Sequence, residues 1–215
     1  MHLIMFDIDG TLVNSYGFDE DCYLEAAEIV LGKVISSNWD DYSNTTDTGI
    51  LDEAIKMNSI PGDRNKIHQD FKRVFVNLIS DFISNNSNSI REIKGASQLI
   101  QKLKNRRDVK IAIATGGFEE SAKLKLNAVG INTQGCAFAS SSDHYSRTEI
   151  MKIAKSRVND NPVFESKTYF GDAEWDQKAS ETLGYRFILV GDRISWSHQI
   201  NDFQDDESIF SMLNL

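Results

Sequence analysis

Short apolar runs that alternate with helical patterns constrain the fold of this 215-residue chain more than any other feature. Each run is too short for a buried helix, and helical patterns lie between most of them. Alternation of this kind predicts an α/β domain with a parallel sheet covered by helices on both faces. The predicted strands are residues 3–8, 109–114, 136–139, 168–170 and 186–190.

A long helical interval interrupts this alternation after the first strand. Apolar residues recur at helical spacing in three places, around Ala26, Ile50 and Phe71, and no convincing strand is found between residues 13 and 89. The polar run 84–89 reads as a linker, or equally as a plain surface loop. We therefore predict an α/β domain of residues 1–14 plus 90–215, with a helical insertion of residues 15–89.

Charge and cysteine content narrow the classes of partner and the location. The net charge of −9 comes with no evident basic face, which argues against nucleic acid and membrane surfaces as partners. Cys22 and Cys136 form no metal-ligand cluster and are typical of buried thiols in a reducing compartment. The start of the chain does not resemble a signal peptide, and no apolar stretch approaches the roughly 18 residues of a membrane helix. We expect a cytoplasmic protein, plausibly a monomer.

Two carboxylates follow the first predicted strand. Residues two apart in a strand face the same way, so Asp7 and Asp9 emerge on one side of the strand end. Ligands of open α/β sheets bind at the carboxyl ends of the strands. Two carboxylates held together repel each other unless a cation or a proton intervenes, although both residues could instead cap a turn.

Three later segments place complementary groups at other strand ends. Thr115 and Gly116 follow the second strand with a hydroxyl and backbone N–H groups, which suit an anion. Asp172 and Asp176 follow the fourth strand and offer oxygen ligands for a hard cation. Arg147 opens the helix after the third strand and adds a positive charge. Each feature alone is weak, but their order and their positions at strand ends make a strong combined signal.

At this point the chain resembles the haloacid dehalogenase superfamily of phosphotransferases. Residues 7–11, with the sequence DIDGT, match its first motif, Thr115 its second, and Asp172 with Asp176 its fourth. The helical insertion resembles the α-helical cap of the phosphoglycolate phosphatase and β-phosphoglucomutase branch. The resemblance spans the whole chain and implies a Rossmann-like core that carries an inserted helical cap domain.

The resemblance also implies roles for these carboxylates. Asp7 would be the nucleophile that forms an aspartyl-phosphate, and Asp9 would protonate the leaving oxygen and then activate water. Mg²⁺ would be held by the Asp7 carboxylate, the Asp9 backbone carbonyl and Asp172, with Asp176 supporting the site from beside it. The substrate would be a small phosphorylated metabolite.

The third motif departs from the family pattern, which has a lysine. Arg147 fills the matching place, and Lys152 lies one helical turn further on and matches less well. Under this interpretation Thr115, the Gly116 N–H and Arg147 would hold the phosphoryl oxygens. Arginine keeps the positive charge but presents it as a planar fork, so the phosphate geometry would differ.

The insertion contributes one further candidate, the polar turn 44–49. Thr48 and Gly49 in this turn would contact the substrate, or the turn would simply cap the helix that follows. Two alternatives to a phosphatase stay open at this stage. One is a phosphomutase on the same scaffold, and the other is a catalytically idle relative that only binds phosphate.

Overall fold

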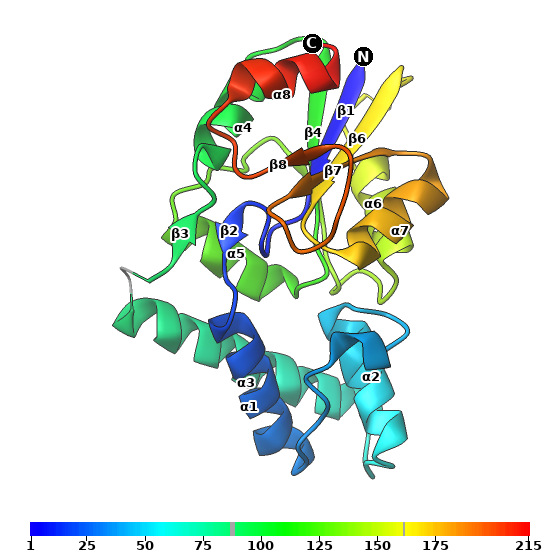
Figure 1. Cartoon of the computed structure of the whole chain (residues 1–215). Helices are drawn as coiled ribbons and strands as arrows, with labels where there is room; N and C mark the ends of the chain where they lie inside the picture. The colour runs from blue at the N-terminus through cyan, green and yellow to red at the C-terminus, as the bar shows by residue number, and fades with distance from the viewer. Residues whose placement is uncertain (87–88, 161) are drawn as a thin grey trace.

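The computed structural model describes residues 1–86, 89–160 and 162–215 (Figure 1). At its centre lies a six-stranded sheet with the order β5-β4-β1-β6-β7-β8, in which every pairing is parallel. This sheet confirms the predicted α/β class. The strands are β1 (His2–Phe6), β4 (Val109–Ala114), β5 (Ala137–Ala139), β6 (Ser166–Gly171), β7 (Arg186–Val190) and β8 (Gln199–Ile200).

Helices cover both faces of the sheet, as the alternation in β1 requires. Ile4 and Phe6 point to one face and belong to the apolar cluster that includes residues of α4, α5 and α8. Leu3 and Met5 point to the opposite face and pack with residues of α6 and α7. The helices are α4 (Ala96–Lys104), α5 (Glu119–Ala128), α6 (Arg147–Ser156), α7 (Glu174–Leu183) and α8 (Asp206–Leu213).

The strand boundaries differ from the predicted ones in ways that local hydrogen bonds explain. β4 and β7 are as predicted, whereas β1 stops at Phe6 because the chain turns after Asp7 through Gly10, whose φ is 73°. β5 begins one residue later than predicted because the Cys136 N–H donates to Thr133 O in a turn, at 3.0 Å. β6 is longer than predicted, and β8 has only two residues, too few for a periodic signal.

The helical insertion begins and ends at a small antiparallel pair of strands, β2 (Val13–Asn14) and β3 (Arg91–Glu92). This pair corrects the prediction that no strand lies between residues 13 and 89, since two residues give no alternation to detect. The predicted linker is also partly wrong, because α3 continues to Asn85, and residues 87–88 lie outside the described residues. The elements between the two strands are α1 (Phe18–Leu31), the 3-10 turn η1 (Trp39–Asp41), α2 (Asp47–Met57) and α3 (Arg64–Asn85).

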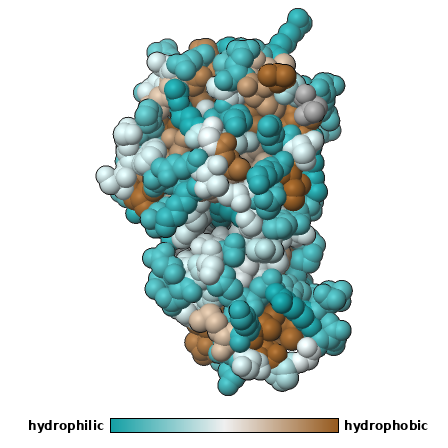
Figure 2. All heavy atoms as spheres, turned by 90° about the vertical axis from the view of Figure 1, so that its right-hand side faces the viewer, coloured by the Kyte–Doolittle hydropathy of each residue, from teal (hydrophilic) through white to brown (hydrophobic). Residues whose placement is uncertain are grey.

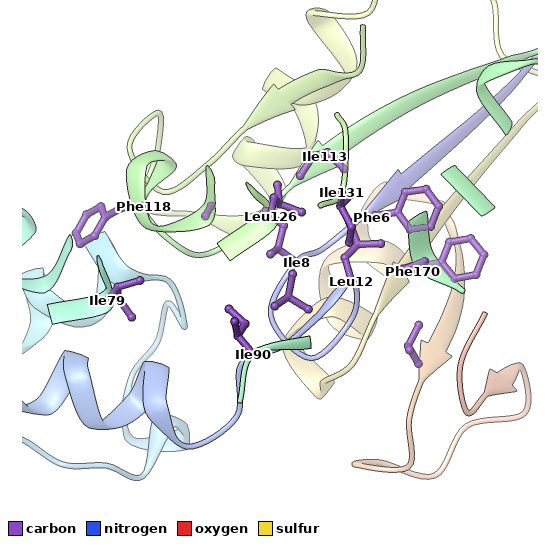
Figure 3. Packing of buried hydrophobic residues seen from close by; sticks show 14 of the residues in the cluster. Phe6, Ile8, Leu12, Ile79, Ile90, Ile113, Phe118, Leu126, Ile131 and Phe170 are labelled. Atoms are coloured by element: carbon purple, nitrogen blue, oxygen red, sulfur yellow. The ribbon is translucent and has the colours of Figure 1, made fainter. Parts of the chain in front are cut away.

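Aromatic packing joins the insertion to the sheet. Within the insertion, the ring of Phe18 in α1 stacks on that of Phe82 in α3, with centroids 4.3 Å apart. Phe118, at the start of α5, contacts Phe71 and Phe75 of α3 at centroid distances of 6.3 and 6.2 Å. Figure 3 shows this apolar cluster reaching from Phe118 toward the sheet. Aromatic pairs in such arrangements stabilise the packing beyond the area that they bury.

The outline of the molecule narrows between its two parts. Figure 2 shows a waist between the sheet-containing part above and the helical insertion below. Among the described residues, no helix is both long enough and apolar enough to cross a membrane.

Candidate active site

The register of the sheet brings three predicted positions to one edge. Phe6, the last residue of β1, pairs with Ile113 of β4 and Phe170 of β6, so Asp7, Thr115 and Asp172 follow adjacent strand ends. The strand order reverses direction at β1, where parallel α/β sheets bind their ligands. A cavity of about 140 Å³ lies at this edge, beneath the helical insertion. Its lining includes Asp7, Asp9, Thr115, Gly116, Arg147 and Asp172.

Three carboxylates form a tight, buried group beside this cavity. Oxygen atoms of Asp7, Asp172 and Asp176 all lie within 4.8 Å of one another. Burial, followed by the charge of Asp176, raises the pKa of Asp7 well above its usual value. The same two causes raise the pKa of Asp172 to about 6. An all-oxygen group whose negative charges repel one another suits a hard divalent cation such as Mg²⁺.

Asp176 reaches this group because a glycine lies beneath it. A Cβ atom on Gly171 would lie 2.5 Å from the Cβ of Asp176, so a larger residue there would displace the carboxylate. Asp176 lies in the first turn of α7, where its Oδ2 accepts hydrogen bonds from the backbone N–H groups of Asp172 and Ala173 at 3.2 and 3.3 Å. These contacts hold one oxygen and leave Oδ1 for a cationic partner.

Arg147 supplies that partner. Its Nη1 donates to Asp176 Oδ1 at 2.8 Å and lies 3.5 Å from Asp7 Oδ1, and its Nη2 donates to Thr45 O at 3.2 Å. Burial disfavours the charge of Arg147, but Asp176 and Asp7 outweigh this effect and raise the pKa of its guanidinium. Its Nε is buried and has no hydrogen-bond partner in the described part of the chain. One buried donor of the Arg147 guanidinium group therefore has no partner among the described residues.

Lys152, the alternative for the third motif, lies elsewhere. Its Nζ pairs with Glu149 at 2.7 Å, and its side chain is 55% exposed. The structure thus places Arg147, rather than Lys152, against Asp7.

Thr115 and Gly116 line the same cavity as the carboxylates of Asp7, Asp9 and Asp172. Thr115 Oγ1 accepts from the Gly117 N–H at 3.2 Å, and the Phe118 N–H donates to Asp47 of the insertion at 2.7 Å. Both N–H groups therefore already have partners within the chain. A Cβ atom on Gly116 would lie 2.3 Å from Arg147 Nη2, so only glycine allows the guanidinium to approach.

The Asp9 carboxylate is not part of the group formed by Asp7, Asp172 and Asp176. Its Oδ1 accepts hydrogen bonds from Ser15 Oγ and Lys125 Nζ, both at 2.5 Å. Of the predicted metal ligands, Asp9 is therefore the one whose carboxylate lies outside the group. A contribution of its backbone carbonyl to a metal site stays a prediction.

Three functional candidates escaped the sequence analysis. Tyr16 and Arg193 both donate to Asp172 Oδ2, at 2.5 and 3.2 Å, and Lys125 holds Asp9. Tyr16 and Arg193 belong to no motif, and neither shows a local signal. Lys125 does show a local signal, because this charged residue lies between Ala122 and Leu126 on the buried, apolar face of α5.

The insertion presents different residues from the predicted ones. Thr48 Oγ1 donates to Ser141 O at 2.8 Å, and Gly49 N–H donates to Thr46 Oγ1 at 3.1 Å. A Cβ atom on Gly49 would lie 2.6 Å from Asn44, so this glycine allows close packing of the turn. The turn instead lines the cavity with residues 45–47, and a substrate contact by Thr48 or Gly49 stays a prediction.

Comparisons with known proteins agree with this geometry. A family model described as haloacid dehalogenase-like hydrolase matches residues 4–190, whereas no curated protein matches the sequence significantly. The solved β-phosphoglucomutase of Clostridium difficile has a TM-score of 0.71 at 16% identity, covering 99% of this chain and 96% of that one. CbbY from Rhodobacter sphaeroides, in complex with phosphate, has a TM-score of 0.68 at 17% identity, covering 94% and 95%. A predicted phosphoglycolate phosphatase from Haemophilus somnus has a TM-score of 0.58 at 19% identity, covering 96% of each. At these identities the structural likeness establishes the fold.

Proposed function

Because the chain belongs to the haloacid dehalogenase-like hydrolases, which its motifs already resembled, we propose that it is a Mg²⁺-dependent phosphatase that hydrolyses a small-molecule phosphate monoester. One observation carries the proposal. Asp7 lies at the bottom of a cavity between two clustered carboxylates, Asp172 and Asp176, and the Arg147 guanidinium. This arrangement suits a phosphate dianion that is held against a carboxylate nucleophile.

The donor set fits Mg²⁺. Asp7 and Asp172 would contribute carboxylate oxygens and Asp9 its backbone carbonyl, while Asp176 would support the site through its contact with Arg147. When bound, the cation would offset the charge of the phosphoryl group as the nucleophile approaches. Burial, followed by repulsion from Asp176, raises the pKa of Asp7, and a cation at this place would relieve that repulsion.

The chain's own residues divide the reaction into two steps. The Asp7 carboxylate attacks phosphorus, the bond to the leaving oxygen breaks, and Asp9 donates a proton to that oxygen. Asp9 then takes a proton from a water molecule, which attacks the aspartyl-phosphate and releases Asp7 and inorganic phosphate. Arg147 and Thr115 hold phosphoryl oxygens in both steps.

The electrostatics of the cavity favour an uncharged or cationic leaving group. Six carboxyl groups and two guanidinium groups line the cavity, and both guanidinium groups, Arg147 and Arg193, already contact the clustered carboxylates. Among the described lining residues, those of the insertion include Asp19, Glu20 and Asp47 but no lysine or arginine. Asp19 is paired with Lys125 and Asp47 accepts a hydrogen bond from the Phe118 N–H, so a leaving group with a carboxylate, such as that of phosphoglycolate, would meet repulsion mainly from Glu20.

The absence of lysine and arginine from the insertion's part of the described cavity lining favours a phosphatase over a phosphomutase that works through a bisphosphate. Such a mutase must bind a second phosphate at the far end of its substrate, which calls for cations on the insertion side. The described lining of the cavity supplies none there.

We further propose that residues 15–89 act as a cap that closes over an active site carried by residues 1–14 and 90–215. A monomeric state and a cytoplasmic location stay predictions.

Phosphate release from p-nitrophenyl phosphate, with and without Mg²⁺, tests the proposal. We expect steady turnover that requires Mg²⁺, is lost with excess chelator, and is abolished in Asp7→Asn, whose fold circular dichroism should show intact. Transfer of phosphate between positions of a sugar phosphate, without release, would instead indicate a mutase. Phosphate binding without turnover would indicate an idle relative.

A further inference from the structure

Lys125 is a buried charge that no motif of the active site includes. Its side chain is fully buried on the face of α5 that also carries Ala122 and Leu126. An uncompensated ammonium group in such a place would be strongly destabilising, so a buried lysine needs anionic partners. Its Nζ has two of them, Asp9 Oδ1 at 2.5 Å and Asp19 Oδ1 at 2.6 Å.

The contact with Asp9 determines which carboxylate oxygen can exchange a proton. Lys125 Nζ and Ser15 Oγ both donate to Oδ1. The second oxygen, Oδ2, lies on the side of Gly117, where an added Cβ atom would be 3.5 Å from it. That Cβ position would also lie 3.6 Å from Thr115 Oγ1 and 3.8 Å from Asp47 Oδ2, and all four residues line the cavity. Two donors thus hold Oδ1, and Oδ2 lies near the cavity-lining groups of Gly117.

The contact with Asp19 connects this arrangement to the insertion. Asp19 lies in the first turn of α1, whereas Asp9 and Lys125 belong to the sheet-containing part. Asp47, the first residue of α2, also approaches α5, where its carboxylate accepts from the Phe118 N–H. Lys125 thus has its full set of anionic partners only when α1 lies against α5.

We propose that Lys125 is a positioning residue that orients Asp9 for proton transfer and, through Asp19, makes this orientation depend on the insertion being seated over the cavity. The inference rests on the proposed phosphatase function. The ammonium group acts on the reaction through its contact with Asp9, and its contact with Asp19 links that effect to the insertion.

A comparison of leaving groups tests this role. The p-nitrophenolate ion leaves without a proton, whereas an alkoxide such as that from glycerol 1-phosphate needs one from Asp9. In Lys125→Met, we expect kcat/KM for glycerol 1-phosphate to fall roughly 30- to 300-fold, against less than about threefold for p-nitrophenyl phosphate. Asp19→Asn should lower kcat/KM for glycerol 1-phosphate by a smaller factor than Lys125→Met does, and again by more than for p-nitrophenyl phosphate, since it weakens the link between Lys125 and the insertion and keeps the contact with Asp9.

Lys123→Met is the matched control. Lys123 lies on the same helix, is 55% exposed and pairs with Glu119, so both substrates should be hydrolysed as in the wild type. If Lys125→Met fails to fold, the double variant Lys125→Met/Asp19→Asn removes one unpaired carboxylate and should show the same leaving-group selectivity. Equal losses on both substrates in folded Lys125→Met, or in the folded double variant, would overturn the positioning role, as would no loss. A wild type that hydrolyses neither substrate would overturn the proposed function itself.

Discussion

At the scale of the residue, four aspartates at one edge of a sheet acquire different roles from their neighbours. Asp7, Asp172 and Asp176 are clustered and share the positive charges of Arg147 and Arg193. Asp9 lies outside this group and accepts hydrogen bonds from Ser15 and Lys125. Under the proposed function, side chains of one chemical type would act as nucleophile, cation ligands and proton carrier because their partners differ.

Substitution of Arg147 tests its assigned role. Arg147→Ala removes the cation that contacts Asp7 and Asp176, and should cost about 2–4 kcal/mol of transition-state stabilisation, or roughly 30- to 1,000-fold in kcat/KM. Arg147→Lys should recover part of this loss, because the charge survives and the planar fork does not. Lys152→Ala removes only an exposed pair with Glu149 and should cost little. If Lys152→Ala is the impaired variant, the third motif lies one turn further into α6.

Thermal unfolding with and without Mg²⁺ tests the cation site independently of turnover. A cation at one hundred times its Kd should stabilise the fold by about 2.7 kcal/mol and raise Tm by roughly 5–10 °C. Asp172→Asn removes one of three mutually repelling carboxylates, so its Tm without Mg²⁺ should not fall below that of the wild type by more than about 2 °C. The Mg²⁺-dependent rise should disappear in this variant. The control Asp81→Asn changes an exposed residue of α3 and should keep the Mg²⁺-dependent rise in Tm. If Asp172→Asn keeps the full rise in Tm, Asp172 is not a ligand.

At the scale of the element, the first turns of the helices perform much of the positioning. α6 begins at Arg147, α7 carries Asp176 in its first turn, and α1 carries Asp19 in its first turn. The start of α2 connects the two parts of the molecule, because Thr46 Oγ1 donates to Tyr145 O at 2.7 Å and Asp47 N–H donates to Gly116 O at 2.8 Å. These helices therefore hold the active site in shape as well as covering it.

Substitutions at two helix N-caps of the insertion should distinguish an effect on stability from an effect on activity. Thr46 caps α2 and also contacts Tyr145, whereas Asp63 caps α3 through the Lys66 N–H alone. Thr46→Ala and Asp63→Ala should each lower the free energy of unfolding by about 1 kcal/mol. Only Thr46→Ala should also lower kcat/KM, by about three- to tenfold, since it loses a hydrogen bond to the sheet-containing part. Urea unfolding and steady-state kinetics on both variants measure this; equal kinetic losses would show that the Tyr145 contact has no functional role.

At the scale of the whole molecule, the seated insertion decides what the substrate meets beyond its phosphate. Under the proposed function, the phosphate end would face Arg147 and the strand ends, and the leaving-group end would face Asp19, Glu20 and Asp47. Charge interactions beside the buried Asp7 and Asp172 are stronger than those in water. We therefore expect recognition of the leaving group to depend on the insertion and not on the catalytic motifs.

Substrates of similar size and different charge test this division. We expect kcat/KM for phosphoglycolate to be at least about tenfold lower than for phosphoethanolamine, since one like-charge contact at this depth costs about 1.4 kcal/mol or more. Glycerol 1-phosphate should lie between them. Glu20→Gln should narrow the gap, because it removes one carboxylate from the lining. A preference for phosphoglycolate would show that a cation of the chain reaches the leaving group.

The sequence by itself determined the placement of the catalytic groups along the sheet. Strand periodicity and the order of the motifs were enough to bring Asp7, Thr115 and Asp172 to adjacent strand ends, because parallel strands end at one edge and their spacing is local. The helical faces of the insertion followed from periodicity in the same way, with Phe71 and Phe75 buried as the spacing required. These features depend on residues within a few positions of one another.

Only the tertiary structure decided which partners these groups have. Asp9 and Lys125 are 116 positions apart and Tyr16 and Asp172 are 156 apart, and no local pattern records such a contact. The choice of Arg147 over Lys152 depended on which turn of α6 faces the sheet, and the β2–β3 pair was too short for alternation to reveal. Side-chain direction and packing between distant segments determine these contacts, so they become visible only when the chain is folded.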